Sequence, residues 1–272
     1  ILLKESSMQF NDYKTIKFER NERILTVTLN LPETMNAVGE GLHTELSKLF
    51  YDLQTDKGSD IIILTGAGKA FSAGGDVDQM KKNNESKDFD TNQLVEAKKM
   101  IFGLLDLEKP IIAKVNGDAM GLGATIALFC DIIFANEEAR IADPHVSVGI
   151  VAGDGGAVIW PQLIGYARAK HYLMTGSMIK GKEAAEIGLI NFSLPLSDLD
   201  EKVDSYAKKL SLGSTDAIRW TKVAVNIGLK QLASSIMDVG LGYEAITIRS
   251  SDHAEGIASF LEKRKPNYGI KK

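Results

Sequence analysis

The chain turns sharply at Phe71-Ser72-Ala73-Gly74-Gly75-Asp76 and again at Asn116-Gly117-Asp118-Ala119-Met120-Gly121-Leu122-Gly123. An apolar run precedes each turn, residues 60–65 and residues 110–115, and each run is typical of a central, buried strand. Glycine lets the backbone after such a strand bend and expose its N–H groups. Two turns of this kind predict a pair of N–H donors that stabilise a negative oxygen, as in an enolate or a tetrahedral intermediate.

The composition excludes several classes of protein. The chain has 272 residues and is 44% hydrophobic, which is enough to bury a full core. Its formal charge of -4 and pI near 5.7 argue against a nucleic-acid partner, because phosphate backbones need a concentrated positive face. No apolar stretch approaches the roughly 20 residues that cross a bilayer, so we expect no membrane partner. Cys130 is the only cysteine, which excludes an internal disulfide and favours a reducing compartment, the cytoplasm.

The order of patterns predicts an α/β fold. Strand-like runs alternate with helical periodicity through residues 13–197, which implies crossover connections and mostly parallel strands. Residues 198–272 differ, because helical patterns at 199–210, 217–228 and 232–251 follow one another without strands between them. We expect a core over the first region and a helical layer over the second. Residues 81–90 are polar and lack apolar periodicity, which favours a mobile segment.

Three titratable residues are candidates for acid/base chemistry. Asp154 lies in a third glycine-rich stretch, residues 149–157, where it either caps the next helix or faces a ligand. His145 lies nine residues earlier, and a carboxylate that orients an imidazole is a standard arrangement for general-base work on water. Glu244 is the third candidate, since small and apolar residues surround it.

Other chemistry is not expected from the pattern. His43, His171 and His253 lie in helical patterns among polar neighbours, so we predict that they occupy solvated faces. No group of residues has metal-ligand spacing, and no phosphate-loop lysine or nucleophile elbow follows the glycines. The sequence therefore predicts neither a metal nor a nucleoside triphosphate.

Several motifs spread along the chain are specific when taken together: Asn36-Ala37, Leu64-Thr65-Gly66, Ala70 to Asp76, Lys109 to Ala113, Asn116-Gly117, Cys130 to Ile133, Leu173 to Gly176, Ala184 to Ile190 and Phe260 to Pro266. With these motifs the chain resembles the crotonase (enoyl-CoA hydratase/isomerase) superfamily over nearly its whole length. The resemblance implies a crotonase-like spiral of ββα units with a C-terminal helical layer used to form trimers, or hexamers built from two trimers. It also implies an acyl-CoA substrate, with coenzyme A as part of the substrate and no separate cofactor.

The resemblance also implies roles for individual residues. It assigns the two oxyanion donors to the backbone N–H groups of Gly75 and Leu122. Contacts with the substrate are expected from Ala37, Ala73, Gly121, Thr125 and Lys263.

The chain departs from the family pattern at the acid/base positions. Family hydratases use two glutamates, and the matching positions here hold Thr125 and His145. A lysine often found after the first glycine turn is also replaced, by Asp78. The combination of His145, Asp154 and Glu244 is similar to that of 6-oxocamphor hydrolase, a superfamily member that cleaves a carbon–carbon bond of a cyclic β-diketone.

Three functions remain open from the sequence. The first is an enzyme that acts on an acyl-CoA thioester through an oxyanion-stabilised enolate, with His145 and Asp154 as its acid/base pair. The second is a carbon–carbon bond hydrolase of a cyclic β-diketone or β-keto acyl substrate, in which His145 activates water. The third is a non-catalytic binding member of the superfamily.

Overall fold

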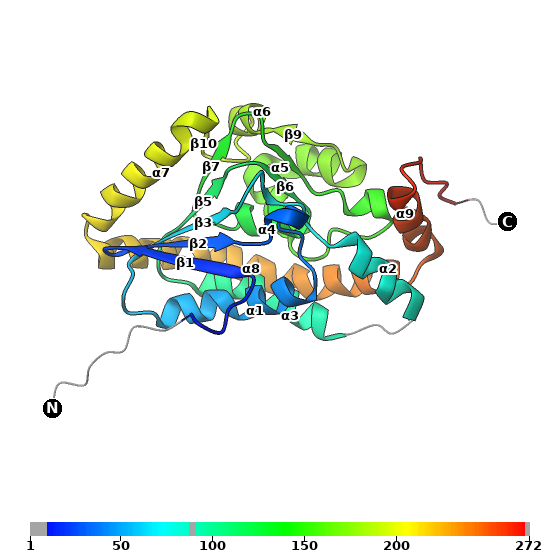
Figure 1. Cartoon of the computed structure of the whole chain (residues 1–272), viewed down its shortest axis with the longest axis horizontal. Helices are drawn as coiled ribbons and strands as arrows, with labels where there is room; N and C mark the ends of the chain where they lie inside the picture. Colours follow the sequence, from blue (N-terminus) through cyan, green and yellow to red (C-terminus); the bar gives the residue numbers. More distant parts are fainter. Residues whose placement is uncertain (1–9, 87–90, 270–272) are drawn as a thin grey trace.

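The computed structural model describes residues 10–86 and 91–269 and has two sheets covered by helices (Figure 1). The larger sheet has the strand order β1-β2-β3-β5-β7-β10, and every neighbouring pair is parallel except β1 with β2. Its strands are β1 (Ile16–Asn21), β2 (Ile24–Leu29), β3 (Ile61–Gly66), β5 (Ile111–Val115), β7 (Ile132–Asn136) and β10 (Phe192–Leu194). The smaller sheet contains β4 (Ala70–Ser72), β6 (Asp118–Met120), β8 (Arg140–Ala142) and β9 (Ile179–Lys180), in that order.

The central strands are largely apolar, and both faces of the larger sheet are covered. Every residue of β3 is buried, and β5 is buried except at Lys114. A parallel sheet covered on both faces has no solvent side, so its strands read as continuous apolar runs and not as alternating ones. The strand predictions at residues 60–65 and 110–115 are confirmed.

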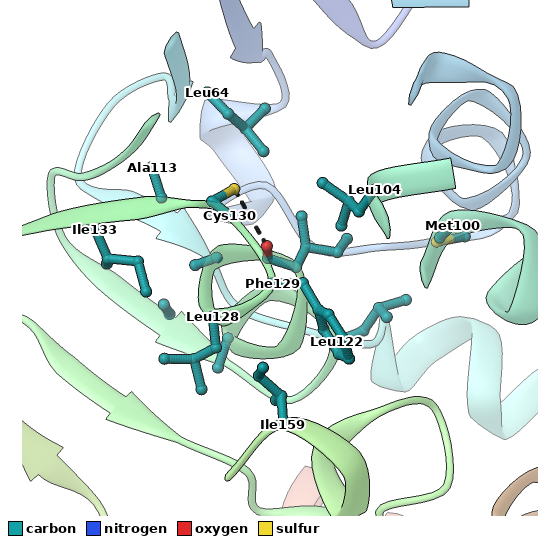
Figure 2. Packing of buried hydrophobic residues seen from close by; sticks show 14 of the residues in the cluster. Leu64, Met100, Leu104, Ala113, Leu122, Leu128, Phe129, Cys130, Ile133 and Ile159 are labelled. Atoms are coloured by element: carbon teal, nitrogen blue, oxygen red, sulfur yellow. Dashed lines mark hydrogen bonds between the residues drawn. The ribbon is translucent and has the colours of Figure 1, made fainter. Parts of the chain in front are cut away.

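Helices cover the two faces of the larger sheet unequally. On one face, α7 packs Leu199, Val203 and Ala207 against strand side chains such as Ile63 and Ile112. The other face carries the main core, which Figure 2 shows where strand residues meet α3, α4 and α5. The helices are α1 (Glu40–Thr55), α2 (Val77–Ser86), α3 (Thr91–Asp106), α4 (Leu122–Leu128), α5 (Gly156–Thr175), α6 (Gly181–Glu186), α7 (Leu196–Ser211), α8 (Thr215–Thr247) and α9 (Ser251–Leu261), with short 3-10 turns η1 (Pro32–Thr34) and η2 (His145–Val148).

The only cysteine belongs to this core. Cys130 is buried, and its Sγ donates a hydrogen bond of 3.4 Å to the carbonyl oxygen of Ile126 (Figure 2). Burial raises the pKa of the thiol well above its ordinary value, so the group stays protonated and packs as a small apolar side chain.

Two expectations about helices are corrected. The patterns at residues 217–228 and 232–251 belong mainly to one helix, α8, because Lys230 and Gln231 continue the helical backbone between them. The polar segment at residues 81–90 is helical as far as Ser86, where α2 ends, and its last four residues lie outside the described part of the chain. Residues of α2 lie close to α9, although α2 buries no residue completely, and the mobility of this segment remains a prediction.

The fold class is confirmed as α/β with parallel strands and a C-terminal layer of helices. The division at residue 197 and the assembly into trimers or hexamers remain predictions. Among the described residues, no helix is both long and apolar enough to span a bilayer.

Candidate active site

A cavity of about 600 Å³ lies where the two glycine turns meet α1, α2, α3, α8 and α9. Five predicted site residues line it, namely Gly75, Leu122, His145, Asp154 and Glu244. These residues come from positions as far apart as 75 and 244 in the chain, so tertiary packing alone brings them together. Its volume is within the usual range for small-molecule sites.

Close backbone contact joins the two glycine turns. Gly74 has a φ of +79°, and a Cβ atom there would lie 2.6 Å from the carbonyl oxygen of Met120. Only glycine accepts both the left-handed conformation and this approach without strain. The contact sets the distance between the segment that carries Gly75 and the segment that carries Leu122.

The N–H groups of Gly75 and Leu122 are available for a ligand. In residues 10–86 and 91–269, no acceptor is paired with either N–H group, whereas the neighbouring N–H of Gly121 donates to Ala142 at 2.9 Å. Figure 2 shows the Leu122 side chain within the hydrophobic core, where only 7% of the residue is exposed. The core therefore anchors a residue that also lines the cavity.

His145 lies between two carboxylates. Its Nδ1–H donates to Oδ1 of Asp143, which is fully buried, and its Nε2 lies 3.3 Å from Oδ2 of Asp154. A carboxylate accepts hydrogen bonds and does not donate them, so each nitrogen of the imidazole faces an acceptor. This arrangement holds the ring in one orientation and favours its doubly protonated form.

The charges of these side chains shift the pKa values of His145 and Asp154. Burial opposes the charged imidazole, but the two carboxylates outweigh it and raise the pKa of His145 well above its ordinary value. Burial also opposes the charged form of Asp154, but the charge of His145 and its hydrogen bond outweigh this and lower the pKa of Asp154. Near neutral pH the pair is therefore an imidazolium beside a carboxylate.

The pKa of Glu244 is raised, whereas that of Asp154 is lowered. Burial and the neighbouring charge of Asp154 raise the pKa of Glu244 to about 8. Its Oε2 atom is shielded from solvent and has no hydrogen-bond partner in the described part of the chain. The cavity thus combines a carboxyl group that keeps its proton, Glu244, with one that loses it, Asp154. Such a separation is typical of an acid/base pair.

The cluster could offer ligand atoms to a cation. One such atom from each of Asp143, His145 and Asp154 lies within 4.8 Å of the others. However, the two nitrogens of His145 point to different carboxylates, so each nitrogen is already engaged. The geometry fits a hydrogen-bonded relay better than a metal site, and the expectation of no metal remains a prediction.

The other residues predicted to bind substrate do not line the cavity. Ala37 and Ala73 are half-buried, Gly121 and Thr125 are buried, and Lys263 is exposed beyond the end of α9. Gly121 is nonetheless close to the cluster, because a Cβ atom there would lie 3.5 Å from Cε1 of His145. Their roles in binding stay predictions.

Sequence reasoning missed several residues of the site. Asp143 is not among the candidates from the sequence, although it is the carboxylate on Nδ1 of His145. The prediction that His43 and His253 occupy solvated faces is wrong, since both line the cavity and His253 is only 3% exposed. His171 is exposed, as predicted. An i, i+2 spacing of Asp and His was the available signal for Asp143, whereas His43 and His253 carried none.

Comparison with known proteins assigns the family. The family model described as enoyl-CoA hydratase/isomerase matches residues 19–271. The chain belongs to the enoyl-CoA hydratase/isomerase family.

Individual relatives and solved structures match this chain over nearly its full length. A Bacillus subtilis protein named as an enoyl-CoA hydratase/isomerase, YngF, is 34% identical over 92% of this chain and 95% of its own length. The crotonyl-CoA hydratase of Syntrophomonas wolfei is 32% identical over 94% of this chain and 98% of its own. The crystal structure of an enoyl-CoA hydratase/isomerase from Mycobacterium paratuberculosis is 33% identical, covers 91% of this chain and 99% of its own, and superposes with a TM-score of 0.87.

The raised pKa of Glu244 predicts that Glu244→Gln changes the stability of the protein by an amount that depends on pH. The pKa of Glu244 is about 8 in the folded chain, whereas an ordinary glutamate has a pKa of 4.5. Between these two pH values the carboxyl group is mostly protonated in the native state and mostly ionised in the unfolded state. Because the native state then binds more protons than the unfolded state, Glu244 makes stability fall as pH rises from about 4.5 to 8. We expect Glu244→Gln to increase the free energy of unfolding at pH 8 relative to the original chain, by on the order of a few kcal/mol.

Urea unfolding at pH 5 and pH 8 checks this expectation. The gain from the substitution should be smaller at pH 5, where both states of the original chain keep more of the proton. Glu255→Gln is the matched control, since Glu255 is bound to Arg264 outside the cavity and the pKa of its carboxyl is lowered by that contact. A gain that is equal at both pH values would contradict the shielded, protonated state of Glu244.

Proposed function

We propose that this chain binds an acyl-CoA thioester and catalyses its reaction through an enolate. The thioester oxygen accepts hydrogen bonds from the backbone N–H groups of Gly75 and Leu122, which stabilise the negative charge as it develops. The observation that carries the proposal is the juxtaposition, in one cavity, of these two unpaired donors with His145 held between Asp143 and Asp154.

The proton transfers are assigned to the His145–Asp154 pair and to Glu244. Asp154 takes a proton from the carbon beside the thioester or from an attacking water, since its Oδ1 atom has no hydrogen-bond partner in the described chain. His145 donates its Nε2–H to Asp154 and stabilises the carboxylate before the transfer, and Asp143 orients the imidazole. Glu244, whose pKa is raised to about 8, returns a proton to the substrate.

Hydration, double-bond isomerisation and carbon–carbon hydrolysis all pass through intermediates that this site stabilises. The hydrolase of a β-diketone or β-keto acyl compound is the second candidate function. It is favoured by the His145–Asp154 pair beside unpartnered carboxylate oxygens, an arrangement suited to activating water.

Parallel assays of the purified protein separate these reactions. Crotonyl-CoA tests hydration, a 3-enoyl-CoA tests isomerisation, and a cyclic β-diketone tests carbon–carbon hydrolysis. We expect turnover of at least one acyl-CoA and a loss of that turnover in His145→Ala. Rapid hydration of crotonyl-CoA that is unchanged in His145→Ala would refute the assigned roles, and turnover of the diketone alone would favour the second function.

A further inference from the structure

A second polar pair faces the cavity apart from the His145 cluster. His43 of α1 and Glu96 of α3 both line the cavity, and Nδ1 of His43 lies 2.7 Å from Oε2 of Glu96. Their side chains are only 16% and 20% exposed, so the pair is largely withdrawn from solvent. The Thr44 hydroxyl lies 3.4 Å from the same Glu96 oxygen and adds a second, weaker contact.

The remaining nitrogen of His43 is unused. Within the described residues, Nε2 of His43 has no hydrogen-bond partner, while Nδ1 is held by Glu96. A carboxylate that engages one nitrogen fixes the ring and leaves the other nitrogen for a ligand. The pair could therefore bind a ligand through Nε2 of His43. The mechanism proposed above assigns no role to this pair.

Polar side chains on α2 and α3 also line the cavity. Gln79, Asn83 and Gln93 line it together with His43 and Glu96, and the Gln79 amide donates to Asn83 at 2.9 Å. A site for an unsubstituted alkyl chain gains its affinity from apolar side chains, and buried polar groups left unpaired would weaken binding. Apolar residues such as Leu94, Ala97 and Ile150 line the cavity as well, so the lining fits an acyl chain that carries a polar substituent.

The charges of the lining limit what that substituent is. Glu40, Asp76 and Glu96 line the cavity in addition to Asp154. The positive charge of His145 is already balanced by Asp143 and Asp154, and Arg249, which also lines the cavity, already has an interaction partner. A carboxylate on the acyl chain would be repelled by these acidic groups. A neutral group that forms hydrogen bonds avoids that repulsion.

We propose that His43, held in place by Glu96, binds a hydroxyl group on the acyl chain of the substrate. The proposal rests on the proposed acyl-CoA function and names the class of acyl-CoA that the site prefers. A hydroxyl both donates and accepts, so it pairs with Nε2 whether that nitrogen carries a proton or not. His43 then determines specificity, and Glu96 is a positioning residue.

Calorimetric binding of saturated acyl-CoA compounds tests the proposal without turnover. The probes are hexanoyl-CoA and its derivatives with a hydroxyl at the fourth, fifth or sixth carbon. We expect at least one derivative to bind the original chain about three- to tenfold more tightly than hexanoyl-CoA, the effect of one net hydrogen bond. His43→Leu should bring this ratio close to one.

Two further variants separate specificity from structural damage. Glu96→Gln should lower the ratio only in part, because the amide still holds the ring, whereas general damage would weaken both ligands equally. His171→Leu is the matched control, since His171 is exposed on α5 and lies outside the cavity lining, and it should leave the ratio unchanged.

The outcomes distinguish this proposal from the proposed function. If hexanoyl-CoA and every hydroxylated derivative bind equally well, the hydroxyl preference is overturned while the acyl-CoA function stands. If the preference persists in His43→Leu, the assignment to His43 is overturned. If no acyl-CoA binds to the original chain, the proposed function fails and this proposal fails with it.

Discussion

Asp154→Asn is expected to lower kcat on the best acyl-CoA substrate by about 10²- to 10⁴-fold, the usual contribution of a positioned acid or base. The substitution keeps the size of the side chain but removes the group that accepts the proton. It also removes one of the two carboxylates that hold the imidazolium of His145, whose Nε2 lies 3.3 Å from Oδ2 of Asp154.

The histidine itself provides a second measurement for Asp154→Asn. Because the charge of Asp154 contributes to the raised pKa of His145, its loss should move that pKa down toward the ordinary value. Titration of the His145 ring by nuclear magnetic resonance follows the change directly. Asp78→Asn is the matched control, since Asp78 is exposed on α2 and does not line the cavity.

A small kinetic effect would contradict the assignment. If Asp154→Asn kept kcat within about threefold of the original value while the pKa of His145 fell, Asp154 would be an electrostatic partner of the histidine and not a base. If neither quantity changed, the contact between the two side chains would be unimportant in solution.

Gly74→Ala is expected to reduce kcat by at least 10²-fold, the approximate effect of losing one oxyanion donor. A Cβ atom at this position would lie 2.6 Å from the carbonyl oxygen of Met120 and 3.5 Å from the nitrogen of Gly121. The backbone of one turn must then move away from the other, which separates the N–H groups of Gly75 and Leu122. The left-handed φ of +79° adds a strain of roughly 1–2 kcal/mol for a residue with a Cβ atom.

Steady-state kinetics and thermal unfolding together check the effect of Gly74→Ala. We expect a lower Tm as well as a lower kcat, because the strain and the contact act on the folded state. Gly228→Ala is the matched control, since Gly228 lies in α8 with no atom near the position of a Cβ. Alanine there should raise stability by about 0.5–1 kcal/mol and leave kcat unchanged. Equal kinetics in Gly74→Ala and the original chain would show that the two turns need not be in contact for catalysis.

Local patterns were sufficient to predict most of the fold. The apolar runs at 60–65 and 110–115 are buried strands of a parallel sheet that is covered on both faces. Such strands have no solvent side, so their continuous apolar sequence is enough to predict them. The single α8 was predicted as two helices because its polar residues near position 230 interrupt the apolar pattern without interrupting the backbone. Periodicity records which side chains are buried, and it does not record where a helix ends.

The site was less accessible to sequence reasoning. His145, Asp154 and Glu244 were selected from their glycine-rich or apolar surroundings, and all three line the cavity. His43 was assigned to solvent because its neighbours along α1 are polar, but contact with Glu96 of α3 depends on a residue 53 positions away. A pairing at that separation leaves no mark on local periodicity.

The amino-acid sequence by itself determined the α/β class, the two glycine turns and the identity of the ionisable residues, because these follow from local composition and backbone freedom. Only the tertiary structure decided how those residues share protons. It placed Asp143 on one nitrogen of His145 and Asp154 on the other, and it withdrew Glu244 from solvent. Proton affinity depends on distance and burial, which are set by the packing of segments far apart in the chain.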